Sequence, residues 1–440
     1  MKPFVEIADR IAERIATGEL PFGARLPPQR KFAFDEGIAV STASRVYAEL
    51  RRRGLVTGEV GRGTFVANRF APLDPLLQEP SGTGIDLEIV FRLGGESREE
   101  IAASTARFFR SGLAERAVMP PSVRGSGSAL AVFANLTSIT SFEVQPDKIL
   151  LSGNGKQAIA ACFSALAPRG GRIAVEALTY PFAIAASRML GIELVPLPMD
   201  DEGMVPEALD HTARAGLRGV YLQPTLQSPL VRTMSARRRQ AIADVLEKHG
   251  LIAIEDRVYS FLKPTLPLAS FAPGHVIQID SLSKRLMPGL SLGIIAAPAP
   301  FQENLARALR SGGWMASSLS VALAQYWIED GVVASVEATK RQDAQEMFAI
   351  ASTAFSGLNY NSSSEALHGW LALPSTWRTE SFTAACADLG IAVAPGSAFA
   401  VGKSVAPSGV RIAYSAPDIT TWTYALQEVA KIASAAPKSQ

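Results

Sequence analysis

The sequence has few of the residues that staple small secreted domains or bind metal ions. Among its 440 residues are two cysteines and four histidines, and the histidines are scattered without metal-ligand spacing. Two cysteines cannot make a disulfide framework. We therefore expect Cys162 and Cys386 to be buried thiols in a reducing compartment, and we expect no metal site.

The sequence also lacks any apolar run near the ~20 residues that are needed to span a bilayer. Its first ten residues contain acidic side chains and no apolar core segment, which argues against a signal peptide. Hydrophobic residues make up 48% and charged residues 19% of the chain, as in a globular cytoplasmic protein with no membrane partner. At 440 residues, two or more domains are expected.

A net charge of +2 is spread unevenly over the chain. Residues 1–69 hold 12 Lys or Arg and 8 Asp or Glu, a balance of +4, whereas the other residues hold 31 and 33, a balance of −2. A basic head on a nearly neutral body is typical of a polyanion-binding module attached to a larger domain.

The pattern of residues 1–69 predicts three helices followed by two short strands. Apolar residues recur at helical spacing over 4–17, a short helix fits 29–36, and a third runs from Ala39 or Ser41 to Arg53. Strands are expected at 55–57 and 64–66, on either side of a glycine-rich turn. Three helices and a two-stranded wing make a winged helix-turn-helix.

Short polar residues and one arginine (Ser41, Thr42, Ser44 and Arg45) lie at the start of the third helix. Such a helix end suits the major groove of DNA. Arg62 lies between two glycines at the tip of the wing, from which it can reach a phosphate or the minor groove.

Four motifs of this head resemble, in order and spacing, the DNA-binding domain of the GntR family. They are Leu26-Pro-Pro-Gln-Arg30, Ser44-Arg-Val-Tyr47, Arg52-Arg-Gly-Leu-Val56 and Gly61-Arg-Gly-Thr-Phe-Val66. The resemblance implies double-stranded DNA as a partner. It implies phosphate and base contacts by Arg30, Ser41, Thr42, Ser44, Arg45 and Arg62.

Residues 70–84 are rich in proline and glycine, which favours an extended linker, and a second domain is predicted over 85–440. From residue 148 on, strand-like runs alternate with helical patterns, which predicts an α/β fold with a mostly parallel sheet covered on both faces. A smaller α+β lobe is expected over 330–440. The expected strands of the large sheet are 148–152, 172–175, 193–197, 219–222, 251–255 and 276–279.

Lys284 follows the apolar run 276–279 and precedes a second apolar run, 290–297. A lysine between two strands lies at the edge of a core, where partial desolvation lowers its pKa. Its neutral amine can attack an aldehyde, as a lysine that forms a Schiff base with pyridoxal phosphate must. A solvated loop lysine is the alternative reading of so short a motif as Ser281-Leu-Ser-Lys284.

Other groups that pyridoxal phosphate needs also follow expected strands, where ligands gather in α/β sheets. The run Gly153-Asn154-Gly155-Lys156 opens a helix whose N-terminus can hold a phosphate. Asp256 is placed to pair with the pyridine nitrogen, Tyr259 to donate to the ring oxygen, and Tyr180 to stack on the ring. Each alone is often structural, but their order before Lys284 favours a cofactor site.

Residues 85–440 resemble a fold-type I aminotransferase domain, and with the head the whole chain resembles the MocR subfamily of GntR regulators. The resemblance implies pyridoxal 5′-phosphate as cofactor on Lys284, with contacts from Ser228 and Ser281, and Arg411 as the group that binds a substrate or effector carboxylate. It also implies a homodimer. The motifs are Ser152-Gly-Asn-Gly-Lys-Gln157, Val175-Glu-Ala-Leu-Thr-Tyr-Pro181, Tyr221-Leu-Gln-Pro-Thr-Leu-Gln-Ser-Pro229, Ile254-Glu-Asp-Arg-Val-Tyr259 and Ser281-Leu-Ser-Lys284.

Three positions depart from the family pattern. Ser228 stands where an asparagine usually contacts the ring oxygen, and Ser291 where an arginine usually binds the phosphate. Residues 119–127 lack the tyrosine that aminotransferases usually supply there. Arg285 and Lys156 are the cations that could replace the arginine. These losses weaken the expected cofactor binding and transamination.

The sequence thus predicts a cytoplasmic, dimeric transcription regulator whose aminotransferase-like domain binds pyridoxal phosphate and senses an amino compound. One alternative is an active aminotransferase with an accessory DNA-binding head. Another is a regulator whose large domain has lost the cofactor and serves for dimerisation. An effector held by Arg411 and Lys284 is expected to change the spacing of the two heads.

Overall fold

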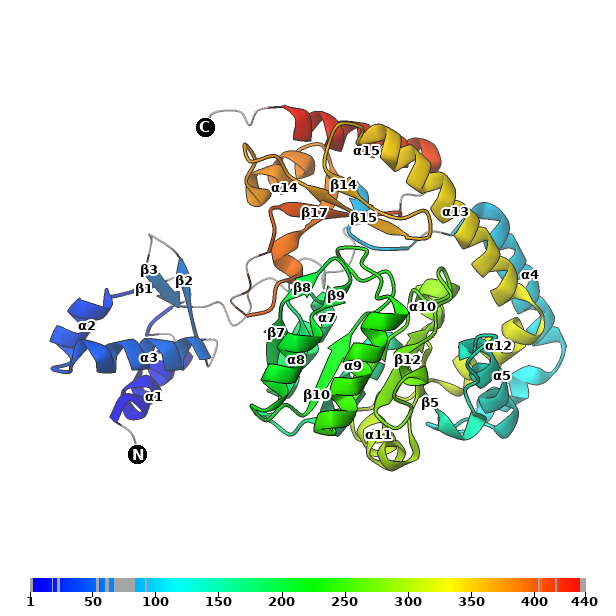
Figure 1. The fold of residues 1–440 in the computed structure, drawn as a ribbon, viewed down its shortest axis with the longest axis horizontal. Helices are drawn as coiled ribbons and strands as arrows, with labels where there is room; N and C mark the ends of the chain where they lie inside the picture. Colours follow the sequence, from blue (N-terminus) through cyan, green and yellow to red (C-terminus); the bar gives the residue numbers. More distant parts are fainter. Residues whose placement is uncertain are drawn as a thin grey trace. The chain divides into compact units, whose positions relative to one another are not determined.

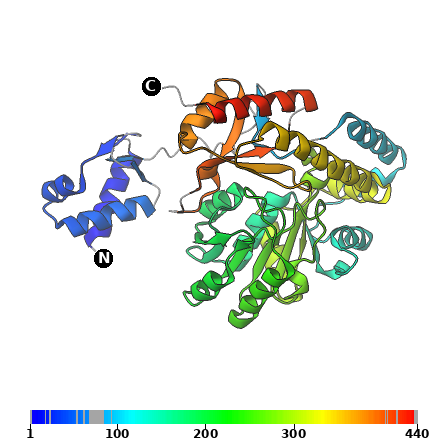
Figure 2. The same ribbon diagram turned by 45° about the horizontal axis from the view of Figure 1, so that its top comes forward.

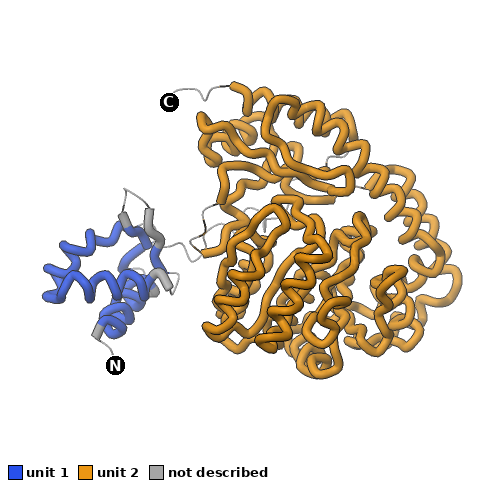
Figure 3. Tube along the Cα trace, viewed as in Figure 1, with its two compact units in different colours: residues 1–78 blue, residues 79–440 orange. Residues whose placement is uncertain are grey.

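The chain divides into two compact units, residues 1–78 and 79–440, drawn in blue and orange in Figure 3. The predicted linker, 70–84, falls outside the described residues except for Gly84, so the domain boundaries stay predictions. The computed structural model describes residues 3–17, 19–21, 24–52, 55–59, 63–66, 84–91, 93–402, 404, 406–415 and 418–435.

The first unit contains the three predicted helices, α1 (Pro3–Ala16), α2 (Gln29–Asp35) and α3 (Val40–Arg52). The hydroxyl of Tyr47 on α3 donates to the backbone carbonyl of Pro27 at 2.5 Å, which ties α3 to the turn before α2. The apolar faces of the helices meet in one core that includes Ile7, Ile11, Phe32, Val46 and Leu50.

Both predicted strands of the wing form, but a third strand joins them, so the wing is a three-stranded sheet and not the two-stranded one predicted. Strands β2 (Val56–Glu59) and β3 (Gly63–Val66) pair antiparallel, and β1 (Arg25–Leu26) pairs with the other edge of β3. The sequence placed Arg25 and Leu26 in a turn-rich bridge, because two residues are too few to show the alternation of a strand.

A seven-stranded sheet forms the core of the second unit (Figure 1), in the order β5-β13-β12-β11-β10-β6-β7. Neighbouring strands are parallel except at β13, which is antiparallel to β5 and β12. The predicted mostly parallel sheet is thus confirmed. Its strands are β5 (Ile149–Ser152), β6 (Arg172–Glu176), β7 (Glu193–Leu197), β10 (Gly219–Leu222), β11 (Ala253–Asp256), β12 (Val276–Ser281) and β13 (Gly293–Ala296).

Alternate strand residues pack against different helices, so both faces of the large sheet are covered. Tyr221 of β10 and Ile254 of β11 belong to one apolar cluster, and the neighbouring Val220 and Ala253 belong to another. The first cluster includes α6 (Gly155–Leu166), α7 (Pro181–Leu190) and α11 (Ala299–Ser311). The second includes α8 (Pro206–Ala213) and α9 (Ala236–His249), which lie in front of the sheet in Figure 1.

A third apolar cluster lies beside the edge strand β5. It is formed by α4 (Gly95–Arg110), α5 (Gly127–Thr137), α12 (Ser318–Glu329) and the start of the long helix α13 (Val332–Ala354). The short elements of this unit are β8 (Met199–Asp200), β9 (Gly203–Met204), α10 (Leu282–Arg285), η2 (Leu113–Val118), η3 (Pro146–Lys148), η4 (Leu268–Ser270), η5 (Pro288–Leu290) and η6 (Gly396–Phe399).

The smaller lobe is a five-stranded sheet in the order β14-β15-β17-β16-β4. Residues of α13, α14 (Thr379–Ala387) and α15 (Ile419–Ser434) pack on one face of it (Figure 2), against Val410 and Ile412 of β17. Arg411, between those two residues, therefore points to the opposite face. The strands are β14 (Tyr360–Asn361), β15 (His368–Ala372), β16 (Ile391–Pro395), β17 (Gly409–Ala413) and β4 (Ile85–Leu87).

Strand β4 joins this lobe although it opens the second unit, and it pairs in parallel with β16. The sequence prediction of a lobe over 330–440 left this strand out. Cys162 and Cys386 are buried free thiols, as predicted. Within the described parts of the chain, no helix combines the length and the apolar sequence that crossing a membrane requires.

Candidate functional site

The predicted site residues of the second unit meet at one edge of the large sheet. Strands β5, β6, β10, β11 and β12 run in the same direction, because the antiparallel β13 lies between β5 and β12. Asn154 follows β5, Tyr180 follows β6, Asp256 ends β11 and Lys284 follows β12. Open α/β sheets bind their ligands at this carboxyl edge.

Lys284 lies in α10, a single helical turn, and its side chain is half-buried. Its Nζ donates to the backbone carbonyl of Val90 at 2.6 Å. Burial, followed by the charges of Arg411 and Lys156, lowers the pKa of this amine to about 7. A large fraction of the amine is therefore neutral near pH ~7, which is the state that attacks an aldehyde.

Asp256 is buried and accepts hydrogen bonds on both carboxylate oxygens. Oδ2 accepts from the Tyr221 hydroxyl at 2.6 Å and from Gln223 Nε2 at 3.1 Å, and Oδ1 accepts from the backbone N–H of Val258 at 3.2 Å. Burial raises the pKa of this carboxyl to about 6, against the opposite effect of the three donors. A cationic ligand group at this position would gain a buried partner of opposite charge.

The start of α6 has the geometry of an anion-binding site. Asn154 caps the helix, with Oδ1 accepting from the N–H of Gln157 at 2.8 Å, and its Nδ2 donates to Ser291 Oγ at 3.4 Å. A Cβ added to Gly155 would lie 3.2 Å from Cβ of the buried Ser281, so this glycine lets the helix start approach the end of β12. The first backbone N–H groups and the dipole of a helix favour an anion, so this helix start suits a phosphate.

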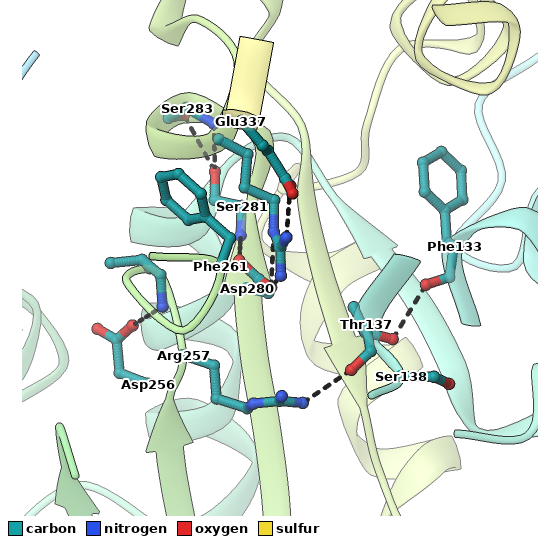
Figure 4. A network of polar contacts seen from close by, with 12 residues as sticks. Phe133, Thr137, Ser138, Asp256, Arg257, Phe261, Asp280, Ser281, Ser283 and Glu337 are labelled. Atoms are coloured by element: carbon teal, nitrogen blue, oxygen red, sulfur yellow. Dashed lines mark hydrogen bonds and ion pairs between the residues drawn. The ribbon is translucent and has the colours of Figure 1, made fainter. Parts of the chain in front are cut away.

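Of the two cations that could replace the missing arginine, Arg285 is committed elsewhere. Its guanidinium is buried in ion pairs with Asp280 at 2.7 Å and with Glu337 at 2.5 Å, and Figure 4 shows both carboxylates in this network. Lys156 is exposed in the first turn of α6. Its positive charge contributes to the lowered pKa of Lys284, so Lys156 is the cation that acts on this site.

The two predicted tyrosines lie in the same neighbourhood. Tyr259 is buried, its ring centre lies 5.3 Å from that of His368, and burial raises its pKa to about 12. Burial also raises the pKa of Tyr180, followed by the effects of Tyr259 and Asp256, while Arg411 lowers it. These mutual electrostatic effects connect both tyrosines with Asp256 and Arg411.

Arg411 is buried on the face of the small sheet that is turned away from its helices. Its Nη1 donates to Ser228 Oγ at 2.9 Å, and its Nη2 donates to the backbone carbonyl of Glu88. The guanidinium carbon lies 4.9 Å from the centre of the Phe399 ring. Among the described residues, Nε has no hydrogen-bond partner. A buried guanidinium with a spare N–H suits a ligand carboxylate.

Sequence reasoning missed Tyr221 and Gln223, the two side-chain donors to Asp256. Both belong to a motif that the resemblance used, and Gln223 directly follows β10. Their position at the carboxyl end of a predicted strand is the sequence feature from which they could have been predicted. Their bonds to Asp256 depend on the pairing of β10 with β11, which is parallel and in register from Val220 with Ala253.

Sequence reasoning also missed two residues from distant elements. Lys340 of α13 is buried, and its Nζ donates to the backbone carbonyls of Lys284 at 2.7 Å and Leu286 at 2.8 Å. His368 of β15 is buried beside Tyr259, and burial lowers its pKa to about 3. Neither has a local sequence signal, since each comes from an element that is distant in sequence from the residue it contacts.

Residues 84–91, the segment that contains β4, lie against this same edge. Their carbonyls accept from Arg411, at Glu88, and from Lys284, at Val90. Asp86 holds the turn, because its Oδ1 accepts from the N–H groups of Glu88 at 2.7 Å and Ile89 at 3.1 Å. The segment thus accepts hydrogen bonds from Arg411 and Lys284, the two cations that are predicted to bind ligands.

In the first unit, α3 has one buried and one exposed face. Arg30 is exposed near the start of α2, and Arg62 lies outside the described residues. On α3, Ser41, Ser44 and Arg45 are exposed and Thr42 is half-buried, whereas Ala43, Val46, Tyr47 and Leu50 are buried as predicted. The polar face of the first turns of α3 is thus available to a partner.

Two family models match the chain. The model described as aminotransferase class I and II matches residues 124–429, and the model of bacterial regulatory proteins of the gntR family matches residues 4–66. Among curated proteins, the HTH-type transcriptional regulator YdeF of Bacillus subtilis is 30% identical over 426 residues, which are 93% of this chain and 90% of the relative. The HTH-type pyridoxine biosynthesis transcriptional regulator PdxR of Corynebacterium glutamicum is 24% identical, over 68% of this chain and 67% of the relative.

Solved aminotransferases share the fold of the second unit. An archaeal alanine:glyoxylate aminotransferase matches with a TM-score of 0.73 and 21% identity, over 87% of this chain and 97% of that one. The α-aminoadipate aminotransferase LysN of Thermus thermophilus, complexed with N-(5′-phosphopyridoxyl)-L-leucine, matches with a TM-score of 0.71 and 21% identity, over 87% and 96%. These matches confirm the predicted fold-type I aminotransferase fold.

Proposed function

The chain belongs to the MocR subfamily of GntR transcription regulators, which carry an aminotransferase-like domain, and we propose that this domain binds pyridoxal 5′-phosphate and senses a small amino compound. The observation that carries the proposal is the meeting, at one sheet edge, of the Lys284 amine, the Asp256 carboxylate and the start of α6. Double-stranded DNA in the cytoplasm is the proposed partner of the head.

The residues at this edge fit pyridoxal phosphate. When bound, the cofactor supplies two groups: an aldehyde, which reacts with an amine, and a ring nitrogen, which draws electrons from the carbon that the amine has joined. Asp256 would hold the proton on the ring nitrogen, and the N–H groups after Asn154, with Lys156, would bind the phosphate. Tyr180 would stack on the ring and Tyr259 would donate to its oxygen, and Ser281 fixes the turn that carries Lys284 through its cap of α10.

Arg411 defines the proposed effector half of the site. A ligand carboxylate would find a buried guanidinium with a spare Nε–H, held in place by Ser228. The amine of the same compound would compete with Lys284 for the aldehyde. The proposed ligand class is therefore an amino compound with a carboxylate. The Thermus thermophilus aminotransferase holding phosphopyridoxyl-leucine supports this, since that molecule joins the two parts.

The missing groups favour sensing over turnover. Ser291 replaces the phosphate-binding arginine, and its Oγ accepts from Asn154 instead. A turnover assay with a panel of amino donors and keto acids distinguishes a sensor from the alternative of an active aminotransferase. We expect no continued formation of product in this assay. A protein that stays colourless with pyridoxal phosphate would favour the other alternative, a cofactor-free large domain.

Segment 84–91 gives the proposal a route from the site to the head. A carboxylate at Arg411 and an aldehyde at Lys284 would each compete with a carbonyl of this segment, at Glu88 and Val90. The chain upstream of Gly84 continues through the predicted linker to the DNA-binding head. An effector that binds more tightly when the segment is displaced would shift the population of head arrangements.

We also propose that the second unit forms a homodimer through an exposed apolar patch. Val118 is 82% exposed, Met119 68%, Phe109 54% and Leu319 42%. Their elements, η2, α4 and α12, pack together, and the hydroxyl of Ser318 donates to the carbonyl of Met119 at 2.6 Å. Large exposed apolar patches mark interaction surfaces, and a two-fold dimer places two heads for two DNA half-sites.

Met119→Asp and Val118→Asp together are expected to raise the dimer dissociation constant at least ~10-fold, because each buried apolar side chain contributes about 1.5–3 kcal/mol. Sedimentation of the full chain measures this. Met189→Asp is the matched control, a methionine 64% exposed on α7 outside the patch. Residues 85–440 alone should stay dimeric and residues 1–69 alone monomeric. A monomeric wild type, or equal effects of patch and control variants, would contradict the proposal.

A further inference from the structure

Gln223 occupies a position between the two halves of the proposed site. It is the first residue after β10, it is 3% exposed, and its own backbone N–H donates to Oε2 of the buried Glu176 at 3.2 Å. Backbone and side chain are both fixed, so the direction of its amide group is determined by the fold.

The two ends of the amide have different partners. Nε2 donates to Oδ2 of Asp256 at 3.1 Å, while Oε1 accepts from the backbone N–H of Ser228 at 3.2 Å. A donor on one side and an acceptor on the other leave a single amide orientation that satisfies both. A hydrophobic residue of the same length would leave the Ser228 N–H buried without this acceptor.

On the cofactor side, Gln223 shares the Oδ2 atom with the hydroxyl of Tyr221, which donates at 2.6 Å. Burial raises the pKa of Asp256 to about 6, and these donors oppose that rise. Hydrogen bonds to the charged form of a carboxylate favour that form. Gln223 therefore helps keep the group that would face the ring nitrogen in its charged form.

On the effector side, Ser228 connects the amide to Arg411. Ser228 is 1% exposed, and its Oγ accepts from Nη1 of Arg411 at 2.9 Å. Moving the Ser228 backbone would move the oxygen that aims the guanidinium. One buried amide thus reaches the proposed ring-nitrogen partner directly and the proposed carboxylate partner through one serine.

We propose that Gln223 is a positioning residue that couples the two halves of the site, holding Asp256 for the cofactor ring and Ser228 with Arg411 for the effector carboxylate. The proposal rests on the proposed function of the domain. It assigns to one side chain a role in both cofactor and ligand affinity, whereas Tyr221, which bonds the same carboxylate atom, would serve the cofactor half alone.

Two probes separate the halves, and binding to the full-length protein is measured by calorimetry. Pyridoxamine 5′-phosphate has the ring nitrogen and phosphate but no aldehyde, so it reports the cofactor half without a covalent bond. N-(5′-phosphopyridoxyl)-L-leucine adds a carboxylate for Arg411. It also adds the apolar leucine side chain, so the ratio of the two dissociation constants reports what the leucine part gains, and we call this the carboxylate gain because Arg411 contacts the carboxylate in the proposal.

Gln223→Met keeps the side-chain length and removes both bonds. We expect this substitution to weaken the binding of pyridoxamine phosphate about tenfold and to reduce the carboxylate gain at least ~3-fold, since hydrogen bonds to charged groups are the stronger ones. The control, Tyr221→Phe, should weaken the binding of both probes by the same factor and leave the ratio of their dissociation constants at the wild-type value. If the methionine variant does not fold, Gln223→Asn, one methylene shorter, replaces it. The affinity for pyridoxamine phosphate and the carboxylate gain should both fall in this variant too.

A Gln223 variant that keeps the wild-type ratio, or the wild-type affinity for pyridoxamine phosphate, would overturn the coupling role. Wild-type protein that binds neither probe would instead contradict the proposed function. Circular dichroism and thermal unfolding without ligand show that each variant is folded. The two failures therefore give different results.

Discussion

Lys284→Ala is expected to abolish covalent attachment of pyridoxal phosphate to the protein. The wild-type chain, mixed with the cofactor, reduced with borohydride and mapped by mass spectrometry, should carry the adduct on the peptide that contains Lys284. Lys340 is the internal control, because burial lowers its pKa to about 7 as well. Its amine is engaged by the carbonyls of Lys284 and Leu286, so it should stay unmodified. An adduct on Lys340, or one that survives in Lys284→Ala, would contradict the assignment.

The attachment should also show the pH dependence of an amine whose pKa is lowered by desolvation. Only the neutral amine attacks an aldehyde, and the pKa of Lys284 is about 7. Below that value, the neutral fraction and the rate should rise about tenfold per pH unit, and above it they should level off. An exposed lysine, with a pKa near ~10.4, would show a rate that is still rising at pH ~9. Rates followed by visible absorbance from about pH 6 to about pH 9 distinguish the two.

Arg45→Ala should weaken binding of the promoter next to the protein's own gene by about 1–3 kcal/mol, roughly 5- to 150-fold, and relax sequence discrimination. Arg45 is exposed in the first turns of α3, on the face opposite the core. Arg30→Ala should weaken the binding of all DNA sequences alike. It should also lower the slope of log affinity against log salt concentration by about one. Fluorescence anisotropy at several salt concentrations measures both effects.

The matched control for these variants is Arg14→Ala. Arg14 is also exposed in the first unit, but it lies on α1 and pairs with Glu19 at 2.7 Å. A surface pair of this kind contributes about 0–1 kcal/mol to stability, so fold and DNA affinity should both persist. Equal affinities of Arg45→Ala and wild type for the promoter would exclude α3 as the helix that reads DNA.

The sequence predicts the elements with strong periodicity and the residues that follow them. Alternation of strand and helix patterns places Asn154, Asp256 and Lys284 after separate strands, and the parallel sheet then brings them together. The helical stripe of α3 likewise separates buried from exposed residues. Such features depend on patterns within a single helix or strand and the residues next to it, which is why they can be predicted without the fold.

Contacts that join distant segments could not be predicted in this way. Strand β4 has three residues, and only its pairing with β16 makes it a strand. The carbonyls of Glu88 and Val90 carry no sequence signal at all, yet they accept from Arg411 and Lys284. The backbone of every residue offers the same carbonyl, so only the path of the chain selects these two.

The role of Arg285 shows the same limit for a charged side chain. Its place beside Lys284 made it a candidate for the phosphate, but Asp280 on β12 and Glu337 on α13 hold it in a buried network. Burying a guanidinium requires such partners. Glu337 comes from a helix far along the chain, and its approach depends on the packing of α13 against α10.

Effector sensing is tested most directly by titrating full-length protein onto a fluorescent promoter fragment. Pyridoxal phosphate is present, and a panel of amino acids and other amines is added in turn. We expect at least one amino compound with a carboxylate to change the DNA affinity of the wild type. The same compound should have no effect without pyridoxal phosphate or on Lys284→Ala. A DNA affinity that responds to no amino compound, or that responds equally in Lys284→Ala, would contradict this expectation.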